Sequence, residues 1–445
     1  MQNNTIKFAI FLSLSLFSVS LFFVACSTTT GQSQNSSFAI GLEPRKNIKG
    51  IEQEWENIQK MYNELIANLN QNPNDSKSKM KLVALYMNEA RVTGASSYYP
   101  AALNLIQSVL SQPNVTQEDA FLGKSYQASI LLSLHQFAQA KKVAEEAVKL
   151  NTYDAGIYGA LVDANIELGN YEEAVKMCDK MLSVRPDLRS YSRASYMRQI
   201  FGDNAGAIAA MKMAIQANPS GLEATEWARV NLGDLYLNQG KLDTAKWIYE
   251  AALHYRPGYA YAEMGLAKVA KAEKNYGEAI NHTQKAIKSL GESSFVSFLA
   301  EMYELKGEKE KAQEIKAEVL TLLEDAEEEN EKETLAKHNG FRELAMAKLD
   351  AAKMQDALED AKKDLALRPN NIDANELVAW IYYKMGDKQN AKLHADNMLK
   401  TNTQNAITLH KAALIYAAAG EMVKANELKN KAENTNKKAA DWVKL

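Results

Sequence analysis

The chain has 445 residues, a formal net charge of −3 and only two cysteines, Cys26 and Cys178. A single compact core of this size would be unusual, because cores stop growing at about 250–300 residues. The small negative charge argues against a nucleic-acid binder, which normally carries a basic face. Two cysteines are too few for a disulfide framework or a thiolate metal site, and Cys178 is predicted to be a buried, inert thiol.

The first segment, residues 1–25, has the layout of a signal peptide. A continuous apolar stretch from Phe8 to Ala25 follows Lys7 and ends directly before Cys26. A positive start, an apolar segment and small residues at the cut are typical of exported proteins. The sequence therefore predicts that the rest of the chain lies outside the cytoplasm.

Cys26 ends a short motif, Phe-Val-Ala-Cys. The motif resembles the lipobox of bacterial lipoproteins, with phenylalanine in place of the usual aliphatic residue. The resemblance implies cleavage before Cys26 and acylation of the new terminus, and several acyl chains give stable anchoring. Because Ser27 is not aspartate, it also implies a cell-envelope protein, lipid-anchored at the outer membrane and facing the periplasm. An uncleaved anchor helix is the alternative, because the apolar stretch is nearly long enough to span a bilayer.

Two further segments precede the main body of the chain. Residues 26–50, rich in Ser, Thr, Gln, Asn and Gly, are predicted to be a flexible tether after the lipidated cysteine, because they cannot bury enough apolar surface to order themselves. Residues 51–120 are predicted to hold a capping helix with Trp55, Met61 and Leu65 on one face, and then a degenerate repeat. Terminal units of an array need such an atypical face.

From Phe121 to Ala432 a pattern of about 34 residues recurs nine times, as stacked helical arrays do. One place in the pattern is always alanine, and the place five residues earlier is glycine in six copies. The alanines are Ala140, Ala174, Ala207, Ala245, Ala279, Ala312, Ala357, Ala391 and Ala425. The glycines are Gly169, Gly202, Gly240, Gly307, Gly386 and Gly420.

The clearest copy shows what each place does. Leu232 and Tyr236 lie four residues apart and share a buried helical face, Gly240 is a left-handed helix stop, and Pro257 cannot continue the second helix. This copy resembles the tetratricopeptide repeat, in which each unit has two antiparallel helices, A and B. The resemblance implies an all-α, right-handed superhelical solenoid of stacked helix-turn-helix units.

The spacing of the copies divides the array. Residues 121–323 form a first block and residues 338–432 a second, and residues 433–445 are predicted to extend a closing helix or to fray. Between the blocks, residues 324–337 are an acidic insertion that we interpret as a solvated, extended helix. A docking patch for a basic partner is the alternative, and the insertion is also a candidate hinge.

No motif in the sequence points to catalysis. The six histidines show no metal-ligand spacing with a partner acid, and neither His-Glu-x-x-His nor Gly-x-Ser-x-Gly nor a phosphate-binding glycine loop occurs. We therefore expect a protein that is not an enzyme and that has no cofactor and no catalytic or metal site.

Function in such arrays lies on the concave face, which is lined by the second, fifth, ninth and twelfth places of each A helix. Exposed aromatic side chains are favoured anchors there, because they bury much area at little entropic cost. Several of these side chains could instead pack between neighbouring repeats. The partner-binding candidates are Tyr196, Trp227, Asp234, Tyr261, Met264, Lys268, Lys271, Trp380 and Tyr383.

Together these features predict a non-catalytic, membrane-tethered scaffold for protein–protein interaction that assembles or supports a cell-envelope complex. Its expected partners are one or more envelope proteins or peptides and, through the lipid anchor, the membrane, but no nucleic acid. The alternative is a transport accessory lipoprotein that docks a soluble binding protein or a small hydrophobic ligand, which a hydrophobic tunnel through the array would support. A hydrolase of unrecognised type is a third class, and it would need a perturbed acid or histidine cluster.

Overall fold

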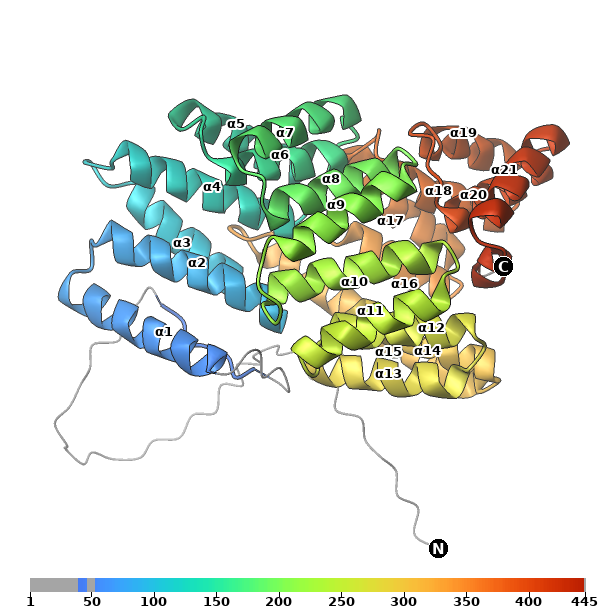
Figure 1. The fold of residues 1–445 in the computed structure, drawn as a ribbon, viewed down its shortest axis with the longest axis horizontal. Coiled ribbons are helices and arrows are strands. Elements are labelled where there is room, and N and C mark those ends of the chain that lie inside the picture. Colours follow the sequence, from blue (N-terminus) through green and yellow to red (C-terminus); the bar gives the residue numbers. More distant parts are fainter. Residues whose placement is uncertain (1–38, 46–52, 444–445) are drawn as a thin grey trace, which may run out of the picture.

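The computed structural model describes residues 39–45 and 53–443 (Figure 1). Within these residues the regular elements are all helices, 22 in number, and they stack as antiparallel pairs. The fold is the all-α solenoid that the repeat predicts. Residues 1–38, which include the predicted signal peptide and Cys26, lie outside the described residues.

Three helices come before the nine repeats and one short helix follows them. The first three are α1 (Glu54–Gln71), α2 (Ser76–Thr93) and α3 (Tyr98–Leu110), and the last is α22 (Ala439–Trp442). The A helices are α4 (Gln117–Ser133), α6 (Ala155–Glu167), α8 (Leu188–Ile200), α10 (Glu223–Asn238), α12 (Ala260–Ala272), α14 (Ser293–Lys306), α16 (Phe341–Asp350), α18 (Ile372–Lys384) and α20 (Ala406–Ala418). The B helices are α5 (Phe137–Leu150), α7 (Tyr171–Val184), α9 (Asn204–Gln216), α11 (Leu242–Tyr255), α13 (Tyr276–Ser289), α15 (Lys309–Lys332), α17 (Met354–Leu367), α19 (Lys388–Met398) and α21 (Met422–Thr435).

Small side chains let the A and B helices of a pair approach closely. All nine repeated alanines are buried, with at most 4% of their surface exposed. On the facing A helix, a β-carbon at Gly233 would lie 2.4 Å from the ring of Tyr249, and the hydroxyl of Ser195 donates to the Ala207 carbonyl at 2.7 Å. Larger residues at these places would push the pair apart, because packed interiors have no spare volume.

The turn between each A helix and its B helix contains one residue in the left-handed conformation. The nine residues, with φ between 55° and 95°, are the six glycines named above and His135, Lys274 and Ala352. Left-handed backbone costs a non-glycine residue roughly 1–2 kcal/mol. The pattern explains why glycine is frequent at this place and why the helix pair can turn sharply.

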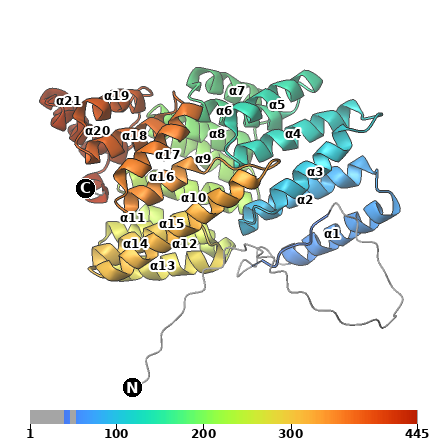
Figure 2. The same cartoon turned by 180° about the vertical axis from the view of Figure 1, so that it is seen from behind.

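The solenoid closes on itself, so that the second block lies against the first (Figures 1 and 2). The side chain of Arg368 pairs with Glu167, the amide nitrogen of Asn371 donates to the Glu167 carbonyl at 3.1 Å, and the backbone N–H of Ile372 donates to the Tyr171 hydroxyl at 2.9 Å. These contacts join residues about 200 positions apart. The array is therefore wound tightly enough for successive superhelical turns to touch.

The acidic insertion takes part in this closure. Helix α15 continues through the insertion to Lys332, and the chain then crosses to the turn after α4. There the side chain of Gln136 donates to the Lys337 carbonyl at 2.5 Å, and the backbone N–H of Asn339 donates to the Leu134 carbonyl at 3.0 Å. The segment after α15 thus contacts the first repeat, and its role as a hinge stays a prediction.

Residues 39–45 contradict the prediction of a flexible tether for that part of residues 26–50. The carbonyl of Ile40 accepts hydrogen bonds from the hydroxyls of Tyr62 (3.0 Å) and Tyr86 (2.7 Å). The buried Arg45 side chain pairs with Glu89 at 2.6 Å and with Glu54 at 2.5 Å. Composition predicted a solvated segment, but these few apolar and charged groups find partners on α1 and α2.

The capping helix differs from the prediction at one residue. Leu65 is buried, but Met61 is 38% exposed, because α1 packs through Ile58, Tyr62, Leu65, Ile66 and Leu69. Among the described residues, no helix combines the length and the apolar character that crossing a bilayer requires.

Candidate functional site

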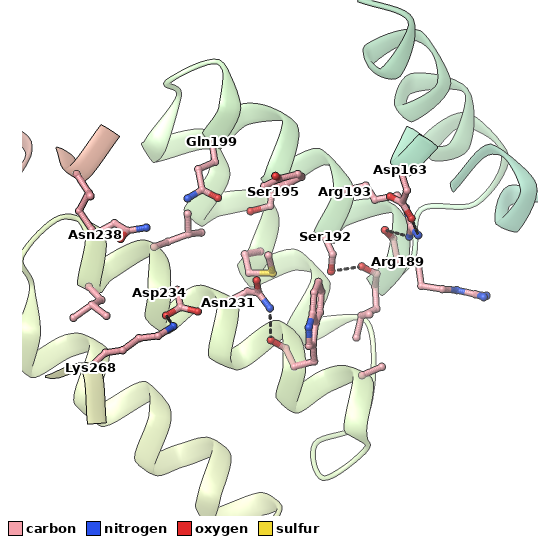
Figure 3. Close-up of a pocket in the computed structure, with 18 of the residues that line it drawn as sticks. Asp163, Arg189, Ser192, Arg193, Ser195, Gln199, Asn231, Asp234, Asn238 and Lys268 are labelled. Carbon is pink, nitrogen blue, oxygen red and sulfur yellow. Dashed lines mark hydrogen bonds and ion pairs between the residues drawn. The ribbon is translucent and has the colours of Figure 1, made fainter. Parts of the chain in front are cut away.

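The wound solenoid forms a partly open cavity of about 1050 Å³ (Figure 3). Its wall comes mainly from the A helices α8 and α10, with smaller contributions from α6, α12 and, through Phe298, α14. Ile407 of α20 and Trp442 of α22 complete the wall from the far end of the chain. The cavity is therefore a product of the closure, because no single block contains all of its lining.

Helix α8 presents one continuous face to the cavity. Arg189, Ser192, Tyr196 and Gln199, the second, fifth, ninth and twelfth places of the repeat, all line it. Tyr196 is 41% exposed to solvent but lies deep inside the wound array, and desolvation there, with the nearby negative charges of Asp373 and Glu167, raises the pKa of its phenol above its ordinary value. The hydroxyl is thus a neutral hydrogen-bonding group across the physiological range.

Helix α10 supplies the aromatic and amide part of the wall. The Trp227 side chain is 36% exposed and Tyr196, across from it in the lining, is 41% exposed. The Asn231 side chain donates to the Trp227 carbonyl at 2.8 Å, and Asn238 lines the cavity two turns further along. Aromatic surface and side-chain amides therefore stand together on one helix.

The charged groups of the cavity are nearly all paired. Arg193 bonds Asp163 at 2.5 Å and Lys268 bonds Asp234 at 3.2 Å, as Figure 3 shows. Lys271 pairs with Glu301 and Arg91 with Glu223, each at 2.7 Å. Burial alone would lower the pKa of Arg193, but the Asp163 carboxylate raises it above its ordinary value. The cavity therefore offers many hydrogen-bonding groups but no strong net field.

Five of the nine predicted partner-binding residues line the cavity. They are Tyr196, Trp227, Asp234, Lys268 and Lys271.

The other four candidates lie elsewhere. Met264 is 5% exposed and packs in an apolar cluster with Phe295 of the next A helix. Trp380 is 6% exposed and stacks on the half-buried Tyr383, with ring centroids 5.0 Å apart. The Tyr261 hydroxyl donates to Glu292 at 2.5 Å, outside the cavity. Neighbouring repeats cover Met264 and Trp380, so these two side chains offer no surface to a partner.

Sequence reasoning missed the residues that closure brings in. Ile407 occupies the second place of the ninth repeat, so the repeat register could have predicted that it lines the concave face. Trp442 lies beyond the last repeat, where no periodic pattern marks a facing side chain. Arg91 comes from α2, in the degenerate unit.

Other chemistry-bearing groups are structural. Cys178 is buried in an apolar cluster, and this burial raises the pKa of its thiol to about 11, as expected of an inert cysteine. Among the described residues, no three His, Cys, Asp or Glu side chains gather in a way that could hold a metal ion.

Comparison with known families gives the same repeat. Residues 131–195 and residues 230–295 each match the tetratricopeptide repeat. The chain therefore contains tetratricopeptide repeats, as its periodic pattern predicts.

Curated relatives match over parts of the chain. A segment of 159 residues is 26% identical to tetratricopeptide repeat protein 37 of Xenopus laevis, over 35% of this chain and 10% of that protein. A segment of 202 residues is 27% identical to the human protein O-mannosyl-transferase TMTC1, over 44% of this chain and 21% of that protein. The chain thus matches a tenth and a fifth of the lengths of these relatives.

Among solved structures, the chain is similar to PilW, a widely conserved type IV pilus biogenesis factor. The identity is 17% and the TM-score 0.38, over 44% of this chain and 91% of that one.

Proposed function

We propose that this protein is a non-catalytic scaffold that holds an extended segment of a protein partner in its central cavity. The observation that carries the proposal is the shared lining of the cavity by successive A helices, with Tyr196 and Trp227 both partly exposed inside it. Tetratricopeptide repeats bind proteins in general, and large aromatic side chains in concave sites are favoured anchors.

The shape of the site favours an extended segment over a folded domain. A cavity of about 1050 Å³ has room for a segment of a few residues but not for a folded domain. Side-chain amides such as those of Asn231 and Asn238 can bond the N–H and C=O groups of a peptide backbone, which needs partners when it is buried.

The membrane part of the proposal rests on the sequence. The signal-peptide layout of residues 1–25 and the lipobox-like motif at Cys26 support a lipid anchor at the outer membrane, with the repeats in the periplasm. The partners proposed are one or more envelope proteins or peptides, and the role is to assemble or support a cell-envelope complex.

A transport accessory that handles a small ligand is the second candidate. Its supporting observation is the volume of the cavity, about 1050 Å³, at the upper end of the usual range for small-ligand sites. Most of the exposed lining is apolar, but it also contains paired charges and amides, which a purely hydrophobic tunnel would lack. The scaffold is therefore the better-supported function.

Crosslinked pull-down from native membranes tests the scaffold. The Trp227→Ala variant should capture its partner at least tenfold less well than the wild type, because the variant loses an aromatic anchor in the cavity. Trp247→Ala is the matched control, since Trp247 is 69% exposed on α11 and does not line the cavity. Equal capture by both variants, with unchanged helical circular dichroism, would remove the cavity as the binding site.

Membrane fractionation tests the anchor separately. Cys26→Ser should move the protein from the membrane fraction to the soluble fraction, because the serine cannot be acylated. If the variant stays with the membrane, the uncleaved anchor helix explains the attachment instead.

A further inference from the structure

The last described residues form α22, which packs against α20 of the ninth repeat and also reaches across to the first block. Helix α21 ends at Thr435, and the chain then returns through α22 toward α10 and α12 (Figure 1). Residues 433–445 were expected to extend a closing helix or to fray, and the contact of this segment with the first block was not predicted. Trp442 lines the central cavity and packs against the apolar cluster that contains Val230, Leu237 and Leu266.

An ion pair and a close packing contact hold residues 436–443 against the turns of the first block, as they could hold a bound peptide. Asp441 pairs with Lys274 at 3.3 Å, and Lys274 holds the left-handed turn place that is glycine in six other repeats. The Asn436 side chain lies against Gly240, within 2.8 Å of where a β-carbon would stand. The segment therefore contacts two successive turns of the first block and fills one end of the cavity with an aromatic ring.

Two buried donors of this segment lack hydrogen-bond partners, which lowers the cost of replacing the segment with another peptide. The indole N–H of Trp442 and the side-chain nitrogen of Asn436 are both buried without a hydrogen-bond partner. Buried donors of this kind cost stability, and they regain water when the segment leaves. The segment is held locally by its connection to α21, which gives it a high effective concentration at the site.

We propose that residues 436–443 are a built-in occupant of the partner site, and that the partner displaces them with an extended segment carrying a large aromatic residue next to an acidic one. The aromatic side chain of the partner takes the place of Trp442, and its carboxylate takes the place of Asp441 at Lys274. This inference rests on the proposed scaffold function and adds to it the chemistry of the partner and a competitor within the chain.

A labelled synthetic peptide with the sequence of residues 434–443, Asn-Thr-Asn-Lys-Lys-Ala-Ala-Asp-Trp-Val, tests the proposal by fluorescence anisotropy. The full-length Trp442→Ala protein should bind this peptide at least tenfold more tightly than the wild type, whose own segment occupies the site. Trp247→Ala is again the matched control and should behave as the wild type. A peptide with alanine in place of its tryptophan should lose the binding.

A second variant keeps the proposal testable if Trp442→Ala fails to fold. Asp441→Lys keeps the tryptophan but sets a positive charge opposite Lys274, and the exposed position of Asp441 makes the substitution compatible with folding. It should also raise peptide affinity at least tenfold. Equal affinity in the wild type and both variants, or no binding to either variant, would overturn the proposal.

The outcomes also separate this inference from the scaffold function. Peptide binding that depends on Trp442, with no envelope protein captured from membranes, would support the occupant and contradict the scaffold. Capture that depends on Trp227, with no difference in peptide affinity, would support the scaffold and overturn the occupant.

Discussion

Glycine at the turn between the A and B helices meets two separate needs, and only some of the repeats require both. Gly169, Gly202 and Gly240 have both a positive φ and a close neighbour from a distant part of the chain, which is the second block for Gly169 and Gly202 and Asn436 for Gly240. At Gly169 a β-carbon would lie 2.3 Å from the backbone carbonyl of Asn370. Gly307, Gly386 and Gly420 also have positive φ, but nothing lies within 4 Å of an added β-carbon there.

Alanine substitutions should expose this difference. Gly386→Ala should cost about 1–2 kcal/mol of unfolding free energy, because only the left-handed backbone is strained. Gly169→Ala should cost at least about 3 kcal/mol, because the second block must also move away and overpacking adds roughly 1–3 kcal/mol. Urea denaturation followed by circular dichroism measures both values, and equal losses would contradict the role given to Asn370.

In the sequence these glycines look alike, so their role as helix stops could be predicted but their close approach to distant residues could not. The periodic pattern identifies the helix stop, because that depends on the glycine alone. The close approach depends on a segment about 200 residues away. Met264 and Trp380 illustrate the same limit, since the register placed them on the concave side but the next A helix buries them.

Among the elements, α1 depends most on distant charges. Glu54, in its first turn, pairs with Arg45 at 2.5 Å and with the fully buried Arg256 of the fourth repeat at 2.9 Å. Burial opposes ionisation of Glu54, but the hydrogen bonds and charges of Arg256 and Arg45 outweigh it and lower its pKa to about 2. The pairs link residues 39–45, α1 and the solenoid.

This lowered pKa predicts the pH dependence of α1. The unfolded carboxyl titrates near its ordinary value of 4.5, so the stabilisation is fully present above that pH and is lost as the pH falls toward 2. Hydrogen exchange of the α1 amides, measured between pH 5 and pH 2.5, should show protection falling through this window. Glu54→Gln should weaken protection at pH 5 and flatten the dependence.

The control for this prediction lies on the same helix. Glu56 is exposed, and Glu56→Gln should leave the protection profile of α1 unchanged. A wild-type profile that does not change between pH 5 and pH 2.5 would contradict the role of Glu54. The sequence could predict α1 as an amphipathic helix, but not its partner Arg256, which is 202 positions away.

At the scale of the whole molecule, the closure of the solenoid creates the cavity. The register predicted which residues of α8 share a face, because that depends only on helical geometry within one repeat. The winding of the array is a sum of small rotations between neighbouring repeats. No local pattern records that sum, so the sequence could not show that the second block would cover the first or that Trp442 would enter the site.

The ion pair between Glu167 and Arg368 gives a direct test of closure. Glu167→Ala removes this contact between the blocks and leaves Arg368 bonded to Asp364 at 2.7 Å. Hydrogen bonds to charged groups contribute about 1.5–3 kcal/mol, so the closed state should weaken by about 1.5 kcal/mol, which is roughly tenfold in its opening equilibrium. Hydrogen-exchange mass spectrometry should then show roughly tenfold faster exchange of the backbone amides of Ile372 and Asn339.

A matched variant within one block distinguishes closure from general destabilisation. Glu301 is 18% exposed and pairs with Lys271 of the neighbouring A helix at 2.7 Å. Glu301→Ala should therefore leave exchange at Ile372 and Asn339 unchanged. If both variants accelerate these amides equally, the contacts between the blocks do not form a separate opening unit. If only Glu167→Ala does so, a partner segment has a route into the cavity that does not require any helix to unfold.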